Sequence, residues 1–412
     1  MRIALVCDYA LDYLGGAQTA LLQQAGALAA AGHEVLLVAP AGRRVPAGLV
    51  PPGVEWRRVR ARLTLPGLGL PLVRNGRALR AELSGLLAAR RIEVVHAHSE
   101  LGLVAAASAV ADDLGIPRLH TVHTLFWRSG LPAALQPLAA ALVAAFHRGV
   151  TGRRLVAAPV QGAPADAALR RMTVTAARGA DAVISPSDHQ AALLRAAGLP
   201  RVVQLENTVA VPGAARPPAL DGAWGPLRVV WAGRATPEKR LGEFVLGAMA
   251  AMDVLGPRAL RVEIVGEGPD LAAARRMARA HPGIVFLGRR AHGETVRRMV
   301  RSHLVALSSH GFDNQPMVVA EACWASRGVL YVDPALREGV ATAGALCDDP
   351  GAEGIAAELV RLAQDRGEVV ALSRQAHAAY ELFRGSRHAA ALERLADAVR
   401  GESRDEAPGM AA

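Results

Sequence analysis

Short apolar runs alternate along this chain with longer segments that are rich in alanine and leucine and have helical periodicity. This alternation is typical of βαβ units, whose strands form a parallel sheet. The stretch 129–178 is helical in pattern and longer than a normal crossover, so it is expected to elaborate the first domain. The strands expected in the first half are Ile3–Cys7, Val35–Ala39, Val94–His96, Arg118–Val122, Ala182–Ser185 and Val202–Leu205.

Proline and glycine interrupt this pattern at residues 211–226, which are therefore predicted to be a linker. The chain is thus expected to be an α/β protein in which two doubly wound, Rossmann-like domains, 1–210 and 227–375, face each other across a cleft. In such folds ligands bind at the carboxyl ends of the strands, so the residues that follow each strand are the candidates for chemistry. The second series of expected strands is Arg228–Ala232, Arg261–Val265, Ile284–Leu287, Leu304–Leu307, Val329–Val332 and Ala345–Cys347.

Composition supports this class. A chain of 412 residues with 51% hydrophobic residues suits two compact domains. The three cysteines, Cys7, Cys323 and Cys347, have no metal-type spacing and are expected to be reduced thiols in a cytoplasmic protein. The apolar run at the N-terminus is too short for a signal peptide. The run Leu138–Phe146 is also short of the roughly 20 residues that span a membrane, so no transmembrane helix is expected.

The net charge of +10 is concentrated in the first half of the chain. Residues 57–91 contain nine arginines and one acid, Glu82. Two interpretations stay open: a solvated face in an arginine-rich protein, or a surface that docks on the anionic inner face of the plasma membrane and presents a lipid acceptor. Nucleic acid is disfavoured, because the stretch has few aromatic side chains for stacking and no recognisable binding motif.

Lys239 is the only lysine among 47 basic residues. It follows an apolar strand and the sequence Gly233-Arg234-Ala-Thr-Pro-Glu, in which Thr236 is a plausible N-cap. The pattern places Lys239 in the first turn of a helix, where the helix dipole disfavours a cation. A cation there makes sense if an anion such as a phosphate lies over the helix end.

Three further strand ends carry candidate groups. Gly15-Gly16 opens a helical run and would let a ligand approach the backbone closely. His123 lies just past a strand, while His96 and His98 could bind a metal only with a third ligand that the sequence does not show. No Gly-x-Gly-x-x-Gly pattern occurs, which argues against a dinucleotide cofactor.

The segment 308–324 is the densest site candidate. Asp313 and Asn314 suit a turn or helix cap, Pro316 suits the first turn, and Glu321 follows within reach of a ligand at the helix start. Carboxylates are strong acceptors for sugar hydroxyls. The chain contains neither an Asp-x-Asp sequence nor a Walker A loop, so a nucleotide sugar bound without metal fits this set best.

At this point the chain resembles the GT-B glycosyltransferases, specifically retaining family 4. The resemblance covers nearly the whole chain, and its most specific part is Gly-Arg-x4-Lys followed by an acid seven residues before Glu321. The other pieces, in order, are Gly15-Gly16, His98-Ser99, Thr121-Val-His123-Thr, Ala180 to Ser187, Glu206-Asn207, Ile264 to Pro269 and Val285 to Gly288.

The resemblance implies a role for each matching residue. Arg234 and Lys239 would bind the donor diphosphate, Glu321 the ribose hydroxyls, and His123 the donor sugar near the reacting carbon. Gly16 would shape a loop against the diphosphate, and residues 376–400 would form a helix that crosses back to the first domain, before a flexible tail at 401–412. Asp313 and the backbone of the next four residues would hold the sugar, and the donor-binding set is Gly15, Gly16, Gly233, Gly266, Asn314, Gln315, Pro316, Met317 and Glu321.

One residue departs from the family pattern, because Asp313 stands where the family usually has glutamate. The carboxylate is retracted by about 1.5 Å, which bears on the sugar contact and the donor. The resemblance implies a retaining hexosyltransferase that uses a nucleoside diphosphate sugar and no metal cofactor. Two other classes are a non-catalytic GT-B scaffold and a Schiff-base enzyme built on Lys239, against which the neighbouring Arg234 and the lack of an apolar pocket argue.

Overall fold

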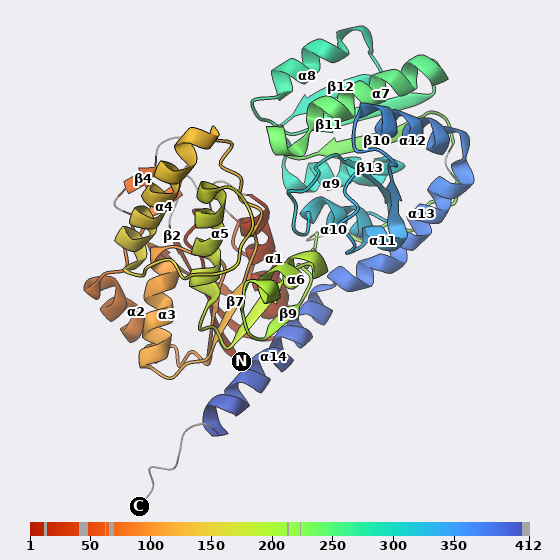
Figure 1. Ribbon diagram of the computed structural model, residues 1–412. Coiled ribbons are helices and arrows are strands. Elements are labelled where there is room, and N and C mark those ends of the chain that lie inside the picture. The colour runs from red at the N-terminus through yellow and green to blue at the C-terminus, as the bar shows by residue number, and fades with distance from the viewer. Residues whose placement is uncertain are drawn as a thin grey trace, which may run out of the picture. The chain divides into compact units, whose positions relative to one another are not determined.

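The computed structural model describes residues 1–11, 15–40, 48–61, 63–65, 70–211, 214–222 and 224–405. The chain forms two compact units, which are shown in Figure 1. Unit 1 comprises Met1–Thr208 and Gly385–Ala412, and unit 2 comprises Val209–Arg384.

Unit 1 is built on a parallel sheet of seven strands in the order β3-β2-β1-β6-β7-β8-β9. All six strands expected in this half are present, within a residue or two of the expected ends. The edge strand β3 and the antiparallel pair β4–β5 were not expected, because β3 alternates exposed charged residues with few apolar ones. The strands are β1 (Arg2–Val6), β2 (Glu34–Pro40), β3 (Val54–Val59), β4 (Leu63–Leu65), β5 (Leu70–Leu72), β6 (Val94–Ala97), β7 (Arg118–Thr121), β8 (Ala182–Ser185) and β9 (Val202–Gln204).

Helices cover this sheet, and the last helix of the chain is one of them. Helix α14 packs on α1 and buries Ala389, Leu392, Ala396 and Val399 in the core of unit 1. The predicted stretch 129–178 forms α4 and α5, which lie side by side. The helices of unit 1 are α1 (Gly16–Ala30), α2 (Arg77–Ala89), α3 (Gly102–Asp113), η1 (Ala133–Leu135), α4 (Gln136–Thr151), α5 (Pro164–Ala177), α6 (Asp188–Ala196) and α14 (Gly385–Asp405).

Unit 2 is built on a parallel sheet of six strands in the order β12-β11-β10-β13-β14-β15. Its six strands are those expected from the sequence. They are β10 (Leu227–Ala232), β11 (Leu260–Val265), β12 (Ile284–Gly288), β13 (Leu304–Leu307), β14 (Gly328–Tyr331) and β15 (Gly344–Leu346). The helical elements are η2 (Pro237–Lys239), α7 (Leu241–Leu255), α8 (Leu271–Met277), η3 (Ala278–Ala280), α9 (His292–Arg301), α10 (Met317–Trp324), α11 (Val340–Ala343), α12 (Ala352–Gln364), α13 (Arg366–Ala379) and η4 (Tyr380–Phe383).

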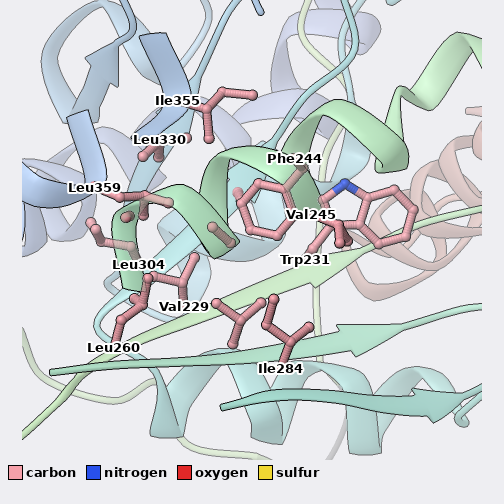
Figure 2. Close-up of a cluster of buried hydrophobic side chains, with 14 of the residues drawn as sticks. Val229, Trp231, Phe244, Val245, Leu260, Ile284, Leu304, Leu330, Ile355 and Leu359 are labelled. Carbon is pink, nitrogen blue, oxygen red and sulfur yellow. The ribbon is translucent and has the colours of Figure 1, made fainter. Parts of the chain in front are cut away.

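One hydrophobic core cluster of unit 2 lies between the sheet and helices α7 and α12. Figure 2 shows Phe244 and Val245 of α7 over Val229 and Trp231 of β10. These side chains are almost fully buried, and each contributes about 2 kcal/mol of hydrophobic stabilisation. A packed core beneath β10 holds the end of that strand, and with it Gly233, in a fixed place.

The unit boundaries differ from the expected domain boundaries. Residues 211–226, predicted to be a linker, belong to unit 2: Arg216 donates to the Cys323 carbonyl at 3.2 Å, and the Leu220 amide donates to Ser373 at 2.8 Å. Ala376 and Phe383 are buried in the core of unit 2, so the chain joins unit 1 only at Gly385. The predicted tail 401–412 begins inside α14, and its residues 406–412 lie outside the described residues.

The apolar run Leu138–Phe146 belongs to a longer helical segment than the sequence suggested. Within the described residues, Ala133–Thr151 is one helix that is long and apolar enough to cross a membrane, judged by length and composition alone. The three cysteines are free and buried.

Candidate active site

The loops after β10 and β11 touch each other through their backbones. Gly266 has a φ of 144°, and a Cβ on it would lie 1.8 Å from the Gly233 carbonyl oxygen. Gly268 has a φ of 152°, and a Cβ on it would lie 2.4 Å from the Ala235 carbonyl oxygen. Only glycine fits such a close approach at these angles. The pair Gly233 and Gly266 is therefore brought together, and it shapes the start of the Arg234–Lys239 segment.

Lys239 lies in a different local structure from the predicted one. Thr236 is the N-cap and Pro237 the first helical residue, as predicted, but the helix is only a short 3₁₀ turn, Pro237–Lys239, and Arg240 has a left-handed φ of 50° before α7 begins at Leu241. The Lys239 backbone is tied to the neighbouring strand end, since Ser308 donates to the Lys239 carbonyl at 2.7 Å. Trp231 in turn donates to the Ser308 hydroxyl at 3.0 Å.

The Lys239 ammonium pairs with Asp313. Its Nζ lies 2.5 Å from Oδ1 of Asp313, and Ser309 donates a hydrogen bond to Oδ2 of the same carboxylate. Both side chains of the ion pair are partly buried. A lysine ammonium has three protons to donate, so two remain for other acceptors. Asp313 therefore orients the sole lysine of the chain at this strand end.

Arg234 is also held by a carboxylate of its own segment. Its guanidinium lies 3.6 Å from Oε1 of Glu238, and Thr236 donates to that same oxygen at 2.8 Å. About half of the Arg234 side chain is exposed. Such an exposed pair is weak, so the guanidinium can turn to a stronger anion at little cost.

The segment 314–317 leads into helix α10. Pro316 is the N-cap residue, with Met317 as the first helical residue, rather than Pro316 lying in the first turn as predicted. Asn314 and Gln315 are buried. Gly311, earlier in the loop, donates its amide to Asp333 at 2.7 Å, and this buried aspartate after β14 was not singled out from the sequence.

Glu321 of α10 is buried, and its partner is a histidine that the sequence did not flag. His292 Nε2 lies 2.9 Å from Oε1 of Glu321. This hydrogen bond to Glu321 raises the pKa of His292 above its usual value. The pair joins the first residue of α9 to the middle of α10, and no sequence motif links these two positions.

The order of the strands gives these contacts a common location. In the sheet of unit 2 the chain runs outward from β10 in both directions, to β11 on one side and to β13 on the other. Lys239 follows β10 and Asp313 follows β13, so their ion pair lies at the topological switch point, where doubly wound sheets bind ligands.

Gly15 and Gly16 lie in unit 1 at the start of α1. Gly15 is the N-cap residue, and its amide donates to the Gln18 side chain at 3.2 Å. A Cβ on Gly16 would meet no atom within 4 Å, so packing among the described residues does not require glycine there. The residues just before it, 12–14, lie outside the described residues.

His123 is the end of a hydrogen-bonded network in unit 1. It shares a hydrogen bond of 2.9 Å with His98, and Gln24 links His98 to His96 and His388. Burial lowers the pKa of His123 and of His388 to about 4, and the pKa of His98 well below its usual value. The network is therefore neutral at pH 7, and His388 of α14 joins it from far along the chain.

The switch point of unit 1 is occupied by a carboxylate of the chain itself. Asp8 follows β1, accepts the Ser99 hydroxyl at 2.7 Å, and accepts the amides of Leu101 and Leu103 at 2.9 and 2.7 Å. Asp8 thereby caps the start of α3, an interaction that the sequence did not reveal. Among the described residues no group of three or more histidine, cysteine, aspartate or glutamate side chains is arranged to hold a metal ion.

Comparisons with known proteins agree with this architecture. Residues 14–211 match the model of Glycosyltransferase Family 4. The Anabaena protein HepE in complex with UDP has a TM-score of 0.65 at 15% identity over 97% of this chain and 100% of that one. Sucrose-phosphate synthase from Thermosynechococcus elongatus has a TM-score of 0.65 at 16% identity over 97% and 99%. The fold is therefore the two-domain, Rossmann-like GT-B fold.

Two curated relatives come from Mycolicibacterium smegmatis. A phosphatidyl-myo-inositol mannosyltransferase is 29% identical over 89% of this chain and 85% of its own. A GDP-mannose-dependent alpha-mannosyltransferase is 28% identical over 70% and 68%. With the family match over residues 14–211 and the fold, these likenesses support a family 4 glycosyltransferase of the GT-B type.

Proposed function

We propose that the chain transfers a hexose from a nucleoside diphosphate sugar to an acceptor, with retention at the anomeric carbon and without a metal cofactor. The observation that carries the proposal is the pairing of Lys239 with Asp313 at the switch point of unit 2. The lysine offers protons to a diphosphate. Arg234 of the same segment forms a weak ion pair with Glu238, which an anion can replace. Glu321 is the acceptor for the ribose hydroxyls.

In the proposed reaction the bond between the anomeric carbon and the diphosphate oxygen breaks as the acceptor oxygen attacks from the same face. The acceptor's proton moves to the leaving phosphate oxygen, so no carboxylate nucleophile is needed. Arg234 and Lys239 stabilise the negative charge that grows on the diphosphate, a contribution worth about 3 kcal/mol for one well-placed donor. His123, neutral at pH 7, contributes a hydrogen bond to the donor sugar.

The relatives named above suggest which donor to test first. Both of those relatives are mannosyltransferases and one is GDP-mannose-dependent, so GDP-mannose is the leading candidate, ahead of the UDP that the HepE complex contains. We propose a lipid or glycan precursor as acceptor, on the cytoplasmic face of the plasma membrane. The arginine-rich stretch 57–91, of which residues 62 and 66–69 lie outside the described residues, would contribute to that membrane contact.

A donor screen tests the proposal. The melting temperature is measured with GDP-mannose, UDP-glucose and ADP-glucose, with and without a chelator, and the selected donor is then offered to lipid and glycan acceptors. We expect one donor to stabilise the protein with the chelator present and the product to keep the anomeric configuration. Stabilisation without transfer to any acceptor would favour a non-catalytic scaffold, and inversion in the product would contradict the mechanism.

A further inference from the structure

Helix α4 of unit 1 leaves large apolar side chains exposed. Its fully buried side chains, Gln136, His147 and Thr151, are all polar, while Val143 and Phe146 are half-buried. Leu138 and Leu142 of α4 are each 61% exposed, and Leu135 at the end of the preceding 3₁₀ turn is 47% exposed. A helix on the surface of a soluble protein normally turns its apolar stripe to the core. The exposed stripe therefore points to a ligand that is itself apolar.

The helix is fixed to the domain by its polar face, so this orientation is not a loose arrangement. Gln136 donates to the Leu131 carbonyl at 2.9 Å and accepts the Ala165 amide at 3.0 Å. At the other end, Asn75 donates its backbone amide to the Val150 carbonyl at 2.9 Å and its side-chain amide to the Thr151 carbonyl at 2.8 Å. Both ends are anchored, and the leucines between them face away from the unit.

Arginines outnumber acids near α4, although Asp166 accepts the Ser129 amide beside the N-terminal end of the helix. No acidic residue occurs from 114 to 165, whereas this stretch has five arginines, of which Arg148 is an exposed residue in the last turn of α4. Beyond Val150 lies a pocket of about 1050 Å³. Its charged lining consists of Arg57, Arg58, Arg60, Arg74, Arg77 and Glu82. Only one of these arginines, Arg57, is paired with Glu82 in the part of the chain described here.

We infer that α4 is an interfacial helix that lies in the plane of an anionic membrane, with Leu135, Leu138 and Leu142 among the acyl chains. The arginines of the adjoining pocket bind the phosphates of the headgroups. An apolar stripe bordered by cations is the pattern of such helices. A second copy of this chain is a poorer occupant, because a symmetric dimer on this face would place arginines against arginines. Spanning is also a poorer fit, since one side of α4 packs on α5.

This surface would make the membrane contact proposed above, and the inference does not depend on sugar transfer. Its test is co-sedimentation of the full-length protein with phosphatidylcholine vesicles in which about a third of the lipid is phosphatidylglycerol. The double variant Leu138→Glu/Leu142→Glu should lose vesicle affinity by roughly 100-fold, since each buried leucine contributes on the order of tenfold or more. The matched control Leu114→Glu/Leu193→Glu, at leucines of unit 1 that are 39% and 38% exposed, should bind like the wild type.

Two further measurements complete the test. Arg74→Ala/Arg77→Ala should weaken binding and reduce its dependence on salt. The melting temperature with the donor nucleotide should be the same for all variants, which separates this surface from the donor site. The inference is overturned if the wild type does not bind these vesicles or binds pure phosphatidylcholine equally well. It is also overturned if Leu138→Glu/Leu142→Glu binds the vesicles as tightly as the wild type. It is also overturned if light scattering shows a dimer that Leu138→Glu/Leu142→Glu dissociates.

Discussion

The two units carry sheets of the same winding but opposite chemistry at their switch points. In unit 1 the position after β1 holds Asp8, a buried carboxylate that already accepts the Leu101 and Leu103 amides at the start of α3. In unit 2 the position after β10 leads to a cation, Lys239, held by Asp313 from the far side of the switch point. Of the two switch points, only the second presents a cation among the described residues, and it is the one that we propose binds the diphosphate.

The residues around the two switch points also differ in charge. Unit 1 surrounds its strand ends with neutral histidines, of which His98 and His123 hydrogen-bond to each other and the others are linked through Gln24. Unit 2 surrounds its strand ends with ion pairs that an incoming anion or hydroxyl can rearrange, and with glycine loops that admit no side chain. The first arrangement is sensitive to protons, and the second to ligand and to backbone crowding.

Lowering the pH should destabilise unit 1 before unit 2. Burial lowers the pKa of the network histidines His123 and His388 to about 4, and it lowers the pKa of His120 in β7 to about 3. Their stabilisation is present above pH 6.5 and is lost as pH falls through these values. Burial raises the pKa of Glu100 to about 7 and also raises the pKa of Asp8. Protonation of these two carboxylates at lower pH offsets part of the loss, but the histidines outnumber them.

We expect a net loss on the order of 5 kcal/mol in the unfolding free energy of unit 1 between pH 6.5 and 4. Hydrogen exchange at pH 7 and at pH 4.5 checks this: amides of β6 and β7 should lose protection before amides of β10 and β13. Unit 2 does contain His303, whose pKa burial lowers to about 4. Earlier loss of protection in unit 2 would show that the network is not the acid-sensitive part of the molecule.

A larger residue at the contact between the loops after β10 and β11 should destabilise unit 2. Gly266→Ala should destabilise that unit by roughly 3–5 kcal/mol, because the new methyl group collides with the Gly233 carbonyl at a φ that strains alanine. Gly256→Ala is the matched control, with a φ of 89° but no atom within 4 Å, and should cost about 1–2 kcal/mol. Denaturant unfolding measures both, and equal costs would mean that the two loops are not in contact.

The fold could be predicted from the sequence further than the site could. All twelve expected strands are present, since buried parallel strands are continuous apolar runs, whereas the half-exposed β3 carries too little apolar signal. The residues after β10 and β13 were found by the rule that ligands bind at strand ends. The 3₁₀ turn at Pro237–Lys239 was missed because Arg240 adopts a left-handed conformation, which an arginine in the sequence does not predict.

The partners of the site residues were the least predictable part. His292 reaches Glu321 from another helix, and His388 reaches Gln24 from the other end of the chain. Such contacts depend on tertiary packing, and neither spacing nor periodicity records them. The capping of α3 by Asp8 is likewise a long-range contact that only the assembled sheet creates.

Removing the cation of unit 2 should slow the reaction. Lys239→Ala should reduce donor turnover about 100-fold or more, equivalent to about 3 kcal/mol, because the charge on the leaving diphosphate loses a preorganised donor. Lys239→Arg should recover little, since a planar guanidinium does not fit the site of a compact ammonium. Arg258→Ala, an exposed arginine of the same unit, is the control and should be fully active. Near-normal turnover by Lys239→Ala would remove the lysine from the mechanism.

The smallest effect is expected at the His292–Glu321 pair. The hydrogen bond to Glu321 raises the pKa of His292, so the stability that this pair contributes is present below pH 6.5 and is lost as pH rises through the raised value. Ribose hydroxyls must compete with the charged histidine for Glu321, so nucleotide affinity should increase as pH rises. His292→Gln should flatten this increase, with a change of about threefold, or less than 1 kcal/mol, in calorimetric titrations from pH 6 to 8. An unchanged pH profile would show that ribose does not use Glu321.

The difference between the two switch points is tested most directly by comparing GDP with GMP in calorimetric titrations of the wild type and of Lys239→Ala. The second phosphate should strengthen binding to the wild type by at least about tenfold, and this gain should disappear in the variant. Asp8 should leave unit 1 without a site for the nucleotide, so a single binding event is expected. A gain from the second phosphate that survives in Lys239→Ala would contradict the assignment of unit 2's switch point as the diphosphate site.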